Sequence, residues 1–85
     1  MKCNLGEYAP STAHNLAKLP TLPLLNIADN KLGMYGVNTA YNLANIKGLK
    51  TVEMLLNDLG EHGSDTAKGL KTSKSIIDTD LVVIN

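Results

Sequence analysis

The 85-residue sequence has no phenylalanine, tryptophan, arginine or glutamine, and its one cysteine is Cys3. Without Phe and Trp, a hydrophobic core must be built from aliphatic side chains and three tyrosines. A single cysteine cannot form an internal disulfide, and a small chain without disulfides is typical of the inside of the cell. The sequence also lacks an apolar run of about 18 residues and a charged-then-apolar amino terminus. We therefore predict a cytoplasmic (intracellular) protein with no membrane partner.

The sequence has no surplus of either charge. Eight lysines balance eight Asp and Glu residues, so the formal net charge is zero. Binding to nucleic-acid phosphates requires clustered positive charge, and arginine is the usual reader of base edges. We therefore predict no nucleic-acid partner. The hydrophobic fraction of 44% favours a globular fold, and 85 residues allow one domain, which we predict to span residues 1–85.

What the sequence does contain is internal repetition. The segment NKLGMYGVNTAYNL (residues 30–43) returns as NDLGEHGSDTAKGL (residues 57–70), with the same residue at half of the positions. Residues 5–16 match residues 32–43 at the same 27-residue offset. Chance would give roughly one identity in such a window, so the repeat is genuine. We predict repeat units at about residues 1–21, 22–48 and 49–75, followed by a terminal strand at 76–85.

Each unit changes its hydrophobic periodicity midway. Leu25 and Ile27 alternate with other residues, as do Val52 and Met54, and this period of two indicates a short strand. After the second glycine, the buried positions recur every third residue, as on one side of a helix. The predicted helical stripes are Pro10, Ala13, Leu16 and Leu19; Val37, Ala40, Leu43 and Ile46; and the weaker Ser64, Ala67, Leu70 and Ser73.

Two segments combine the strand pattern with a double glycine and a helix. They read LPLLNIADNKLGMYGV and LKTVEMLLNDLGEHGS, and CNLGEYAP is a partial earlier copy. Both follow L-x-x-L-x-L-x-x-N-x-L and resemble the leucine-rich repeats of the ribonuclease-inhibitor-like, helix-containing class. The resemblance implies an α/β fold: a leucine-rich-repeat solenoid arc of about three 27-residue repeats, with short parallel strands on the concave side and α-helices on the convex side.

The polar and glycine positions of the pattern have physical roles. Asn30 and Asn57 follow the predicted strands where the chain turns. A side-chain amide can pair with turn backbone groups that would otherwise be buried without a partner. Cys3 takes the equivalent place in the first unit, a substitution that the family's pattern permits. Gly33 and Gly60 allow a backbone turn that a Cβ would obstruct.

The last unit allows two registers. A shift of one residue would place Asn85 on the asparagine position but would turn Asp80 into the core. A buried, unpaired carboxylate costs on the order of several kcal/mol, which outweighs one missing turn amide. We therefore predict the 27-residue step, in which Ile84 replaces the asparagine. The inward residues are then Ile76, Thr79, Leu81 and Ile84.

No arrangement of side chains predicts catalysis. GMYG and GEHG match the loop that clamps nucleic acid in KH domains, but their recurrence after each strand favours a turn. His14 and His62 have no partner at zinc-ligand spacing, and Cys3 has no nearby histidine to activate it. No further carboxylate follows Asp78 and Asp80 at calcium-loop spacing, which favours a solvated pair. We therefore predict no enzyme activity, no cofactor and no metal.

Strand residues between the inward ones face the opposite side of the sheet. In-register parallel strands place equivalent positions of successive repeats side by side, so Glu53, Asp78 and Asp80 make this face acidic, with Asp29 and Asp58 at its rim. The lysines of the helices and following segments are Lys18, Lys47, Lys68, Lys71 and Lys74. The same carboxylates are compatible with ordinary solvated charges. The predicted partner-binding residues are Leu24, Asn26, Ala28, Thr51, Glu53, Leu55, Asp78, Asp80 and Val82.

Two functions are compatible with this pattern. The first is a non-enzymatic protein–protein interaction module that binds a protein with a basic surface through the concave strand face. The second is a structural segment or small subunit of a larger assembly, held through its uncapped repeat ends. No polar cap is evident at either end, and a terminal strand such as DLVVIN would offer backbone groups to a neighbouring strand.

Overall fold

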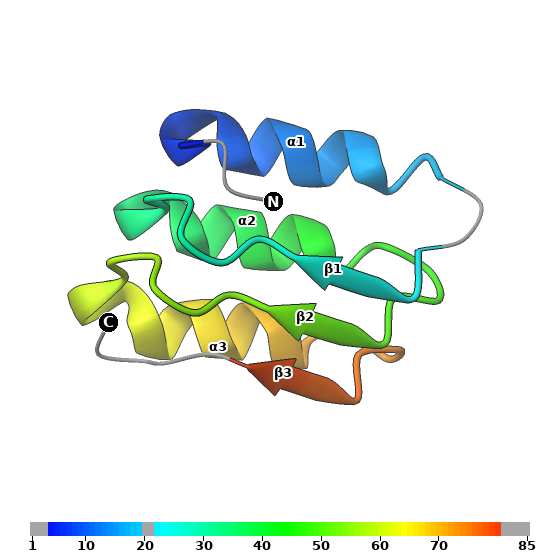
Figure 1. Cartoon of the computed structure of the whole chain (residues 1–85). Helices are drawn as coiled ribbons and strands as arrows, with labels where there is room; N and C mark the ends of the chain where they lie inside the picture. Colours follow the sequence, from blue (N-terminus) through cyan, green and yellow to red (C-terminus); the bar gives the residue numbers. More distant parts are fainter. Residues whose placement is uncertain (1–3, 20–21, 81–85) are drawn as a thin grey trace.

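The structure is a computed structural model in which residues 4–19 and 22–80 are described, the last three by their backbone alone. Short helices and strands alternate along the chain (Figure 1). The 3₁₀ helices η1, η2 and η3 span Gly6–Tyr8, Gly33–Tyr35 and Gly60–His62. Each leads directly into an α-helix: α1 (Ala9–Leu16), α2 (Gly36–Leu43) and α3 (Gly63–Lys71). The strands are β1 (Leu24–Asn26), β2 (Thr51–Glu53) and β3 (Asp78–Asp80).

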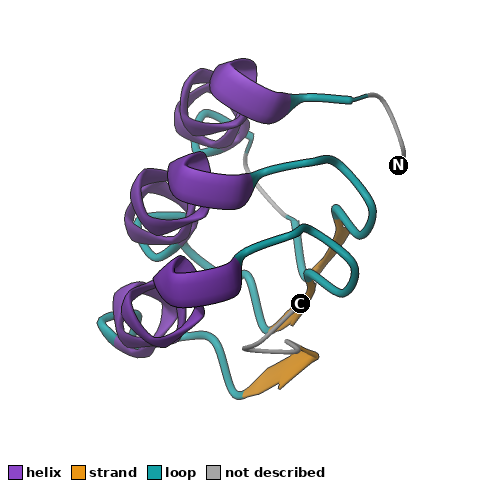
Figure 2. Ribbon diagram, turned by 90° about the vertical axis from the view of Figure 1, so that its left-hand side faces the viewer, coloured by secondary structure: helices purple, strands orange, loops and turns teal. Residues whose placement is uncertain are grey.

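These elements form two layers. The three strands make one parallel sheet in the order β1-β2-β3. The three α-helices lie side by side against one face of that sheet, as Figure 2 shows from the end of the layers. No described helix covers the other face, so it is the open face of the sheet. The architecture therefore separates a helical side from a strand side.

The pairing of neighbouring strands follows the step of the repeat. Leu25 of β1 is paired with Val52 of β2, and Val52 is paired with Thr79 of β3. The predicted register of the last unit is therefore confirmed at Thr79, and the shifted register that turns Asp80 inward is wrong. The predictions for Cys3, Leu81 and Ile84 lie outside the described residues.

The core lies between the two layers and is aliphatic, as predicted. Its sheet side consists of Leu25, Ile27, Val52 and Met54, none more than 8% exposed. Its helix side includes Ala9, Ala13, Ala40, Leu43 and Leu70. Leu19, which the three-residue spacing placed in the buried stripe of the first helix, is 46% exposed, and Ser64 of the third stripe is also exposed, so these parts of the prediction are wrong.

A threonine recurs in each helix because it connects the helix to the 3₁₀ turn before it. The hydroxyl of Thr39 donates to the carbonyl oxygen of Tyr35 at 2.7 Å, and Thr66 donates to that of His62 at 2.7 Å. Thr39 and Thr66 are buried, and a buried hydroxyl is stabilised by such a partner. Thr12 makes the same bond to Tyr8 at 3.0 Å in the half-exposed first unit.

The two asparagines of the repeat connect the turns after the strands, as predicted. Asn57 is fully buried, and its side-chain nitrogen donates to the carbonyl oxygens of Met54 at 2.8 Å and Ile27 at 3.1 Å. Its side-chain oxygen accepts the backbone N–H of Asn30 at 2.7 Å. Asn30 in turn donates to the Ile27 carbonyl oxygen at 3.0 Å. Each amide therefore pairs with its own turn, and Asn57 also pairs with the turn of the preceding unit.

The residues on either side of each asparagine adopt a left-handed backbone. Asp29 and Lys31 have φ values of 56° and 55°, and Leu56 and Asp58 have values of 60° and 52°. This conformation costs an ordinary L-residue about 1–2 kcal/mol, and Asn and Asp adopt it more readily because their short polar side chains bond locally. Burial of the Leu56 side chain offsets little of this backbone cost, because the side chain is 59% exposed.

The predicted leucine-rich-repeat solenoid arc of about three 27-residue repeats is wrong. The described chain is a small compact α/β unit with principal extents of 31 × 22 × 16 Å and a radius of gyration of 11.1 Å. Only β1–α2 and β2–α3 are complete strand–helix pairs, because no described strand precedes α1 and no described helix follows β3. Curvature in a solenoid accumulates from a small rotation at each repeat, and two complete pairs are too few to form an arc.

Replacing Asn57 with leucine should lower the free energy of unfolding by about 3 kcal/mol. The substitution removes the amide that pairs with the Asn30 N–H and the Met54 carbonyl, and each buried group left without a partner costs about 1–3 kcal/mol. Urea denaturation followed by circular dichroism measures the change. Asn38→Leu, at an exposed position of α2, is the matched control and should alter stability by less than about 0.5 kcal/mol. Equal effects of the two substitutions would contradict the role of Asn57.

Leu56→Asn should raise the free energy of unfolding by about 0.5–1 kcal/mol, because asparagine tolerates the left-handed backbone better than leucine does. The same denaturation experiment applies. Met34→Asn is the control, since Met34 is also largely exposed but does not have a positive φ. A loss of stability in the Leu56 variant would show that its partial apolar burial outweighs the backbone cost.

Candidate functional site

The open face of the sheet carries the predicted binding residues that the structure describes. Along β1, Leu25 is buried while Leu24 and Asn26 are exposed, and along β2, Val52 is buried between the half-buried Thr51 and Glu53. Successive strand side chains point to opposite faces, so the exposed set is directed away from the helices. Leu24 is 55% exposed, a large fraction for a leucine within a sheet.

The strand register brings these residues into two rows across the sheet. One row consists of Leu24, Thr51 and Asp78, and the other consists of Asn26, Glu53 and Asp80. Adjacent parallel strands lie about 4.8 Å apart, so the members of a row are direct neighbours. These lateral neighbours are the ones predicted from the repeat. The sequence could predict them because a 27-residue step fixes which positions meet.

A third predicted row is described only in part. Ala28 and Leu55 follow β1 and β2 and are both half-buried. The backbone N–H of Asp29 donates to the Leu55 carbonyl oxygen at 2.9 Å, so the two segments remain side by side beyond the strands. The Ala28 N–H is bonded at 3.0 Å to the side-chain oxygen of Asn26. Val82 lies outside the described residues.

The two sides of the molecule differ in the charged residues they carry. Glu53 lies in the middle strand of the open face, and Asp78 and Asp80 occupy the neighbouring register positions. Asp29 and Asp58 lie in the turns after β1 and β2, at the end of this face. The lysines assigned to the helical side lie in α3 or in the segments after the helices: Lys18, Lys47, Lys68, Lys71 and Lys74.

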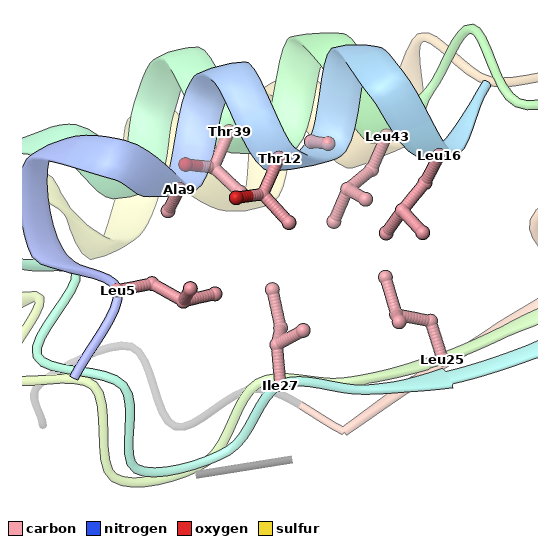
Figure 3. A pocket seen from close by; sticks show the side chains of 9 residues that line it. Leu5, Ala9, Thr12, Leu16, Leu25, Ile27, Thr39 and Leu43 are labelled. Atoms are coloured by element: carbon pink, nitrogen blue, oxygen red, sulfur yellow. The ribbon is translucent and has the colours of Figure 1, made fainter. Parts of the chain in front are cut away.

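Sequence reasoning did not identify a second feature, a narrow apolar recess beneath α1 that has no room for a water molecule. In Figure 3, side chains of the first helix face those of β1 and the residues after it across this recess. The residues that line it include Leu5, Ala9, Thr12, Leu16, Leu25 and Ile27. The available sequence signal was the absence of a strand pattern before the first glycine of the repeat.

The remaining candidates lie apart from one another. His14 is exposed on α1, whereas His62 is in η3, where its nearest ion-pair partner is the adjacent Glu61 at 3.7 Å. Among residues 4–19 and 22–80, no group of three or more His, Cys, Asp and Glu side chains could hold a metal ion. None of the helices in this described part has the length and apolar character required to cross a bilayer. Cys3 lies outside the described residues.

The open face can therefore bind another surface, using apolar area from Leu24, hydrogen-bonding groups from Asn26 and Thr51, and negative charge from Glu53. Among the described residues, these rows contain no paired nucleophile and base. Comparison of the chain with protein-family models, curated proteins and solved structures finds no match.

Proposed function

We propose that this protein is a non-enzymatic interaction module that binds a protein partner through the open face of its sheet. The observation that carries the proposal is the exposure of Leu24 beside Thr51, next to the row of Asn26 and Glu53, on a face that no described helix covers. Interaction surfaces combine an apolar centre with a polar rim, and Leu24, Thr51 and Glu53 provide groups of both kinds. A cytoplasmic location and a relationship to the leucine-rich repeats are part of the same proposal.

The partner's contact surface is basic with an apolar centre. Glu53 and the register positions of Asp78 and Asp80 supply negative charge across two adjacent strands. Lysine or arginine side chains of the partner complement this charge, which directs the encounter and disfavours acidic proteins. Leu24 and Leu55 provide apolar contact on the same face.

A basic peptide tests this function directly. A peptide of alternating lysine and leucine, titrated into the ¹⁵N-labelled protein, should shift the amide signals of β1 and β2 more than those of α2. Glu53→Lys should weaken binding at least about tenfold, equivalent to about 1.4 kcal/mol, because it places like charges in contact. Glu61→Lys, at an exposed carboxylate in η3, is the matched control and should leave the affinity unchanged.

Two results would exclude the open face as the binding surface. One is a set of shifts confined to the helices. The other is an equal loss of affinity in the Glu53 and Glu61 variants, which would reflect only the total charge of the protein. Far-ultraviolet circular dichroism of each variant verifies that the fold is intact.

A second function, a structural segment held in a larger assembly through its ends, is favoured by the recess beneath α1. Leu5 and Leu16 line this recess and are half-buried, whereas their counterparts Leu32 and Leu43 in the next unit are fully buried. An apolar surface of this kind is stabilised when a neighbour covers it.

In the isolated protein at low concentration, amide exchange should be faster in α1 than in α2. The reason is that α2 packs between two α-helices, whereas α1 has α2 as its only neighbouring α-helix among the described elements. Hydrogen exchange monitored by NMR measures both helices in one sample. Equal protection of α1 and α2 would mean that the first unit is stable without a neighbour.

A further inference from the structure

At the α1 end of the molecule, apolar residues are less buried than their counterparts in the middle unit. Leu32, Leu43 and Ile46 of the second unit are at most 1% exposed. Their counterparts one repeat earlier are Leu5 and Leu16, which are half-buried, and Leu19, which is 46% exposed. The residue types are the same or closely similar, so the difference in burial reflects the neighbour that covers the second unit and that no described residue supplies to the first.

At the opposite end, formed by α3 and β3, apolar residues are also less buried than their counterparts in the middle unit. Ala40 and Leu49 of the second unit are fully buried, whereas their counterparts Ala67 and Ile76 in the third unit are half-buried. Ala67 and Ile76 line a shallow recess together with Leu70, Lys71 and Ile77. At this end the sheet continues as β3, but no described helix lies against it (Figure 1).

The two ends therefore have matching steps. At one end α1 extends beyond β1, and at the other β3 extends beyond α3 (Figure 1). Among residues 4–19 and 22–80, no helix lies against β3 and no strand lies beneath α1, so α1 and β3 are each an element that the opposite end could accept. Both steps arise from the same 27-residue repeat. A second copy whose α1 lies one helix spacing beyond α3 of the first copy therefore continues the spacing of both the helices and the strands.

We propose that the chain stacks head to tail with a second copy of itself. In this arrangement β3 of one copy lies beneath α1 of the next copy and pairs in parallel with the outer edge of its β1. At the same time α3 of the first copy packs against α1 of the second. The stack is independent of the open sheet face, and it rests on the second proposed function, for which it identifies the partner.

The contacts between copies follow from the contacts within one chain when each residue is replaced by its equivalent in another repeat. The side-chain nitrogen of Asn42 on α2 donates to the Pro10 carbonyl oxygen of α1 at 2.8 Å. The equivalent positions across the junction are Asn15 and Ser64, so Asn15 of one copy would donate to the Ser64 carbonyl oxygen of the other. Asn15 is exposed in the single chain, which leaves its amide accessible for this bond.

The close approach of the helices also has a counterpart. A Cβ built on Gly69 of α3 would lie 3.0 Å from the Cβ of Ala40 on α2, so these helices are in intimate contact. The same positions between copies are Asn15 and Ala67, and Asn15 has the side chain that Gly69 lacks. The junction therefore follows the α1–α2 contact, in which Asn42 takes this position. In the strand layer, Asp78 of one copy takes a place beside Leu24 of the next, on the side opposite to the one that Thr51 occupies in the single chain.

Charge and symmetry are compatible with such a stack. The formal net charge is zero, so copies do not repel one another over a distance. The two contacting surfaces are different, which makes the interface heterologous, and repetition of a heterologous contact extends the assembly until it closes or is blocked. β1 is the edge strand of the described sheet, and no described strand pairs with its outer side, which is therefore suited to parallel pairing.

Single substitutions that block one end each test the stack. Asn15→Lys places a charge in the contact at the α1 end, and Ala67→Lys places one at the β3 end. Sedimentation velocity of the wild-type protein should show growing species as the concentration rises, whereas each variant alone should remain monomeric. An equimolar mixture of the two variants should form a dimer, because one intact α1 end then meets one intact β3 end. Asn38→Lys, at an exposed position in the middle helix, is the matched control and should assemble as the wild type does.

A wild-type protein that sediments as a monomer at every concentration would overturn the proposal. So would assembly that survives both blocking substitutions, or a mixture of the variants that stays monomeric. Ser64→Lys, at an exposed position, replaces Ala67→Lys if circular dichroism shows that the latter does not fold. A monomeric wild type with rapid amide exchange in α1 would reject self-stacking. It would remain compatible with a different protein that covers the two ends. Peptide binding at β1 and β2 is measured separately from both.

Discussion

The structure depends on one constraint: no strand–helix unit can bury its own apolar side chains, so each shares a core with the units beside it. Val52 and Met54 are buried because β1 and β3 flank their strand and the helices cover them. The buried amide of Asn57 makes this dependence specific, since it bonds to carbonyl oxygens in its own turn and in the preceding one. Removing a neighbour therefore exposes both apolar area and polar backbone.

The same constraint explains why the two candidate surfaces differ. The open face of the sheet is exposed because strand side chains alternate, and it keeps its composition however many units are stacked. The ends are exposed because the units beside them are absent from the described chain, as the half-buried Leu5, Leu16 and Ala67 indicate. The first surface suits a partner with complementary charge, whereas the second suits a partner with the geometry of the repeat itself.

Several elements of the fold and of the candidate site were predictable because the repeat constrains them. A 27-residue step places Leu24 beside Thr51 and Asn26 beside Glu53 without knowledge of any distance. It also excludes the shifted last strand, since a buried Asp80 would lack a partner. The solenoid arc was not predictable on this basis, because a repeat pattern specifies how units pair and does not specify how many complete units form a curve.

Composition and spacing by themselves determined which side chains are aliphatic, which of them face the helices, and which polar residue closes each turn. Only the tertiary structure decided the exposure of Leu19, the recess beneath α1 and the compact shape of the unit. The physical reason is that periodicity is a local property of the chain, whereas burial depends on the neighbours that reach each residue. Leu19 and Ile46 hold the same place in the repeat, and only Ile46 is covered.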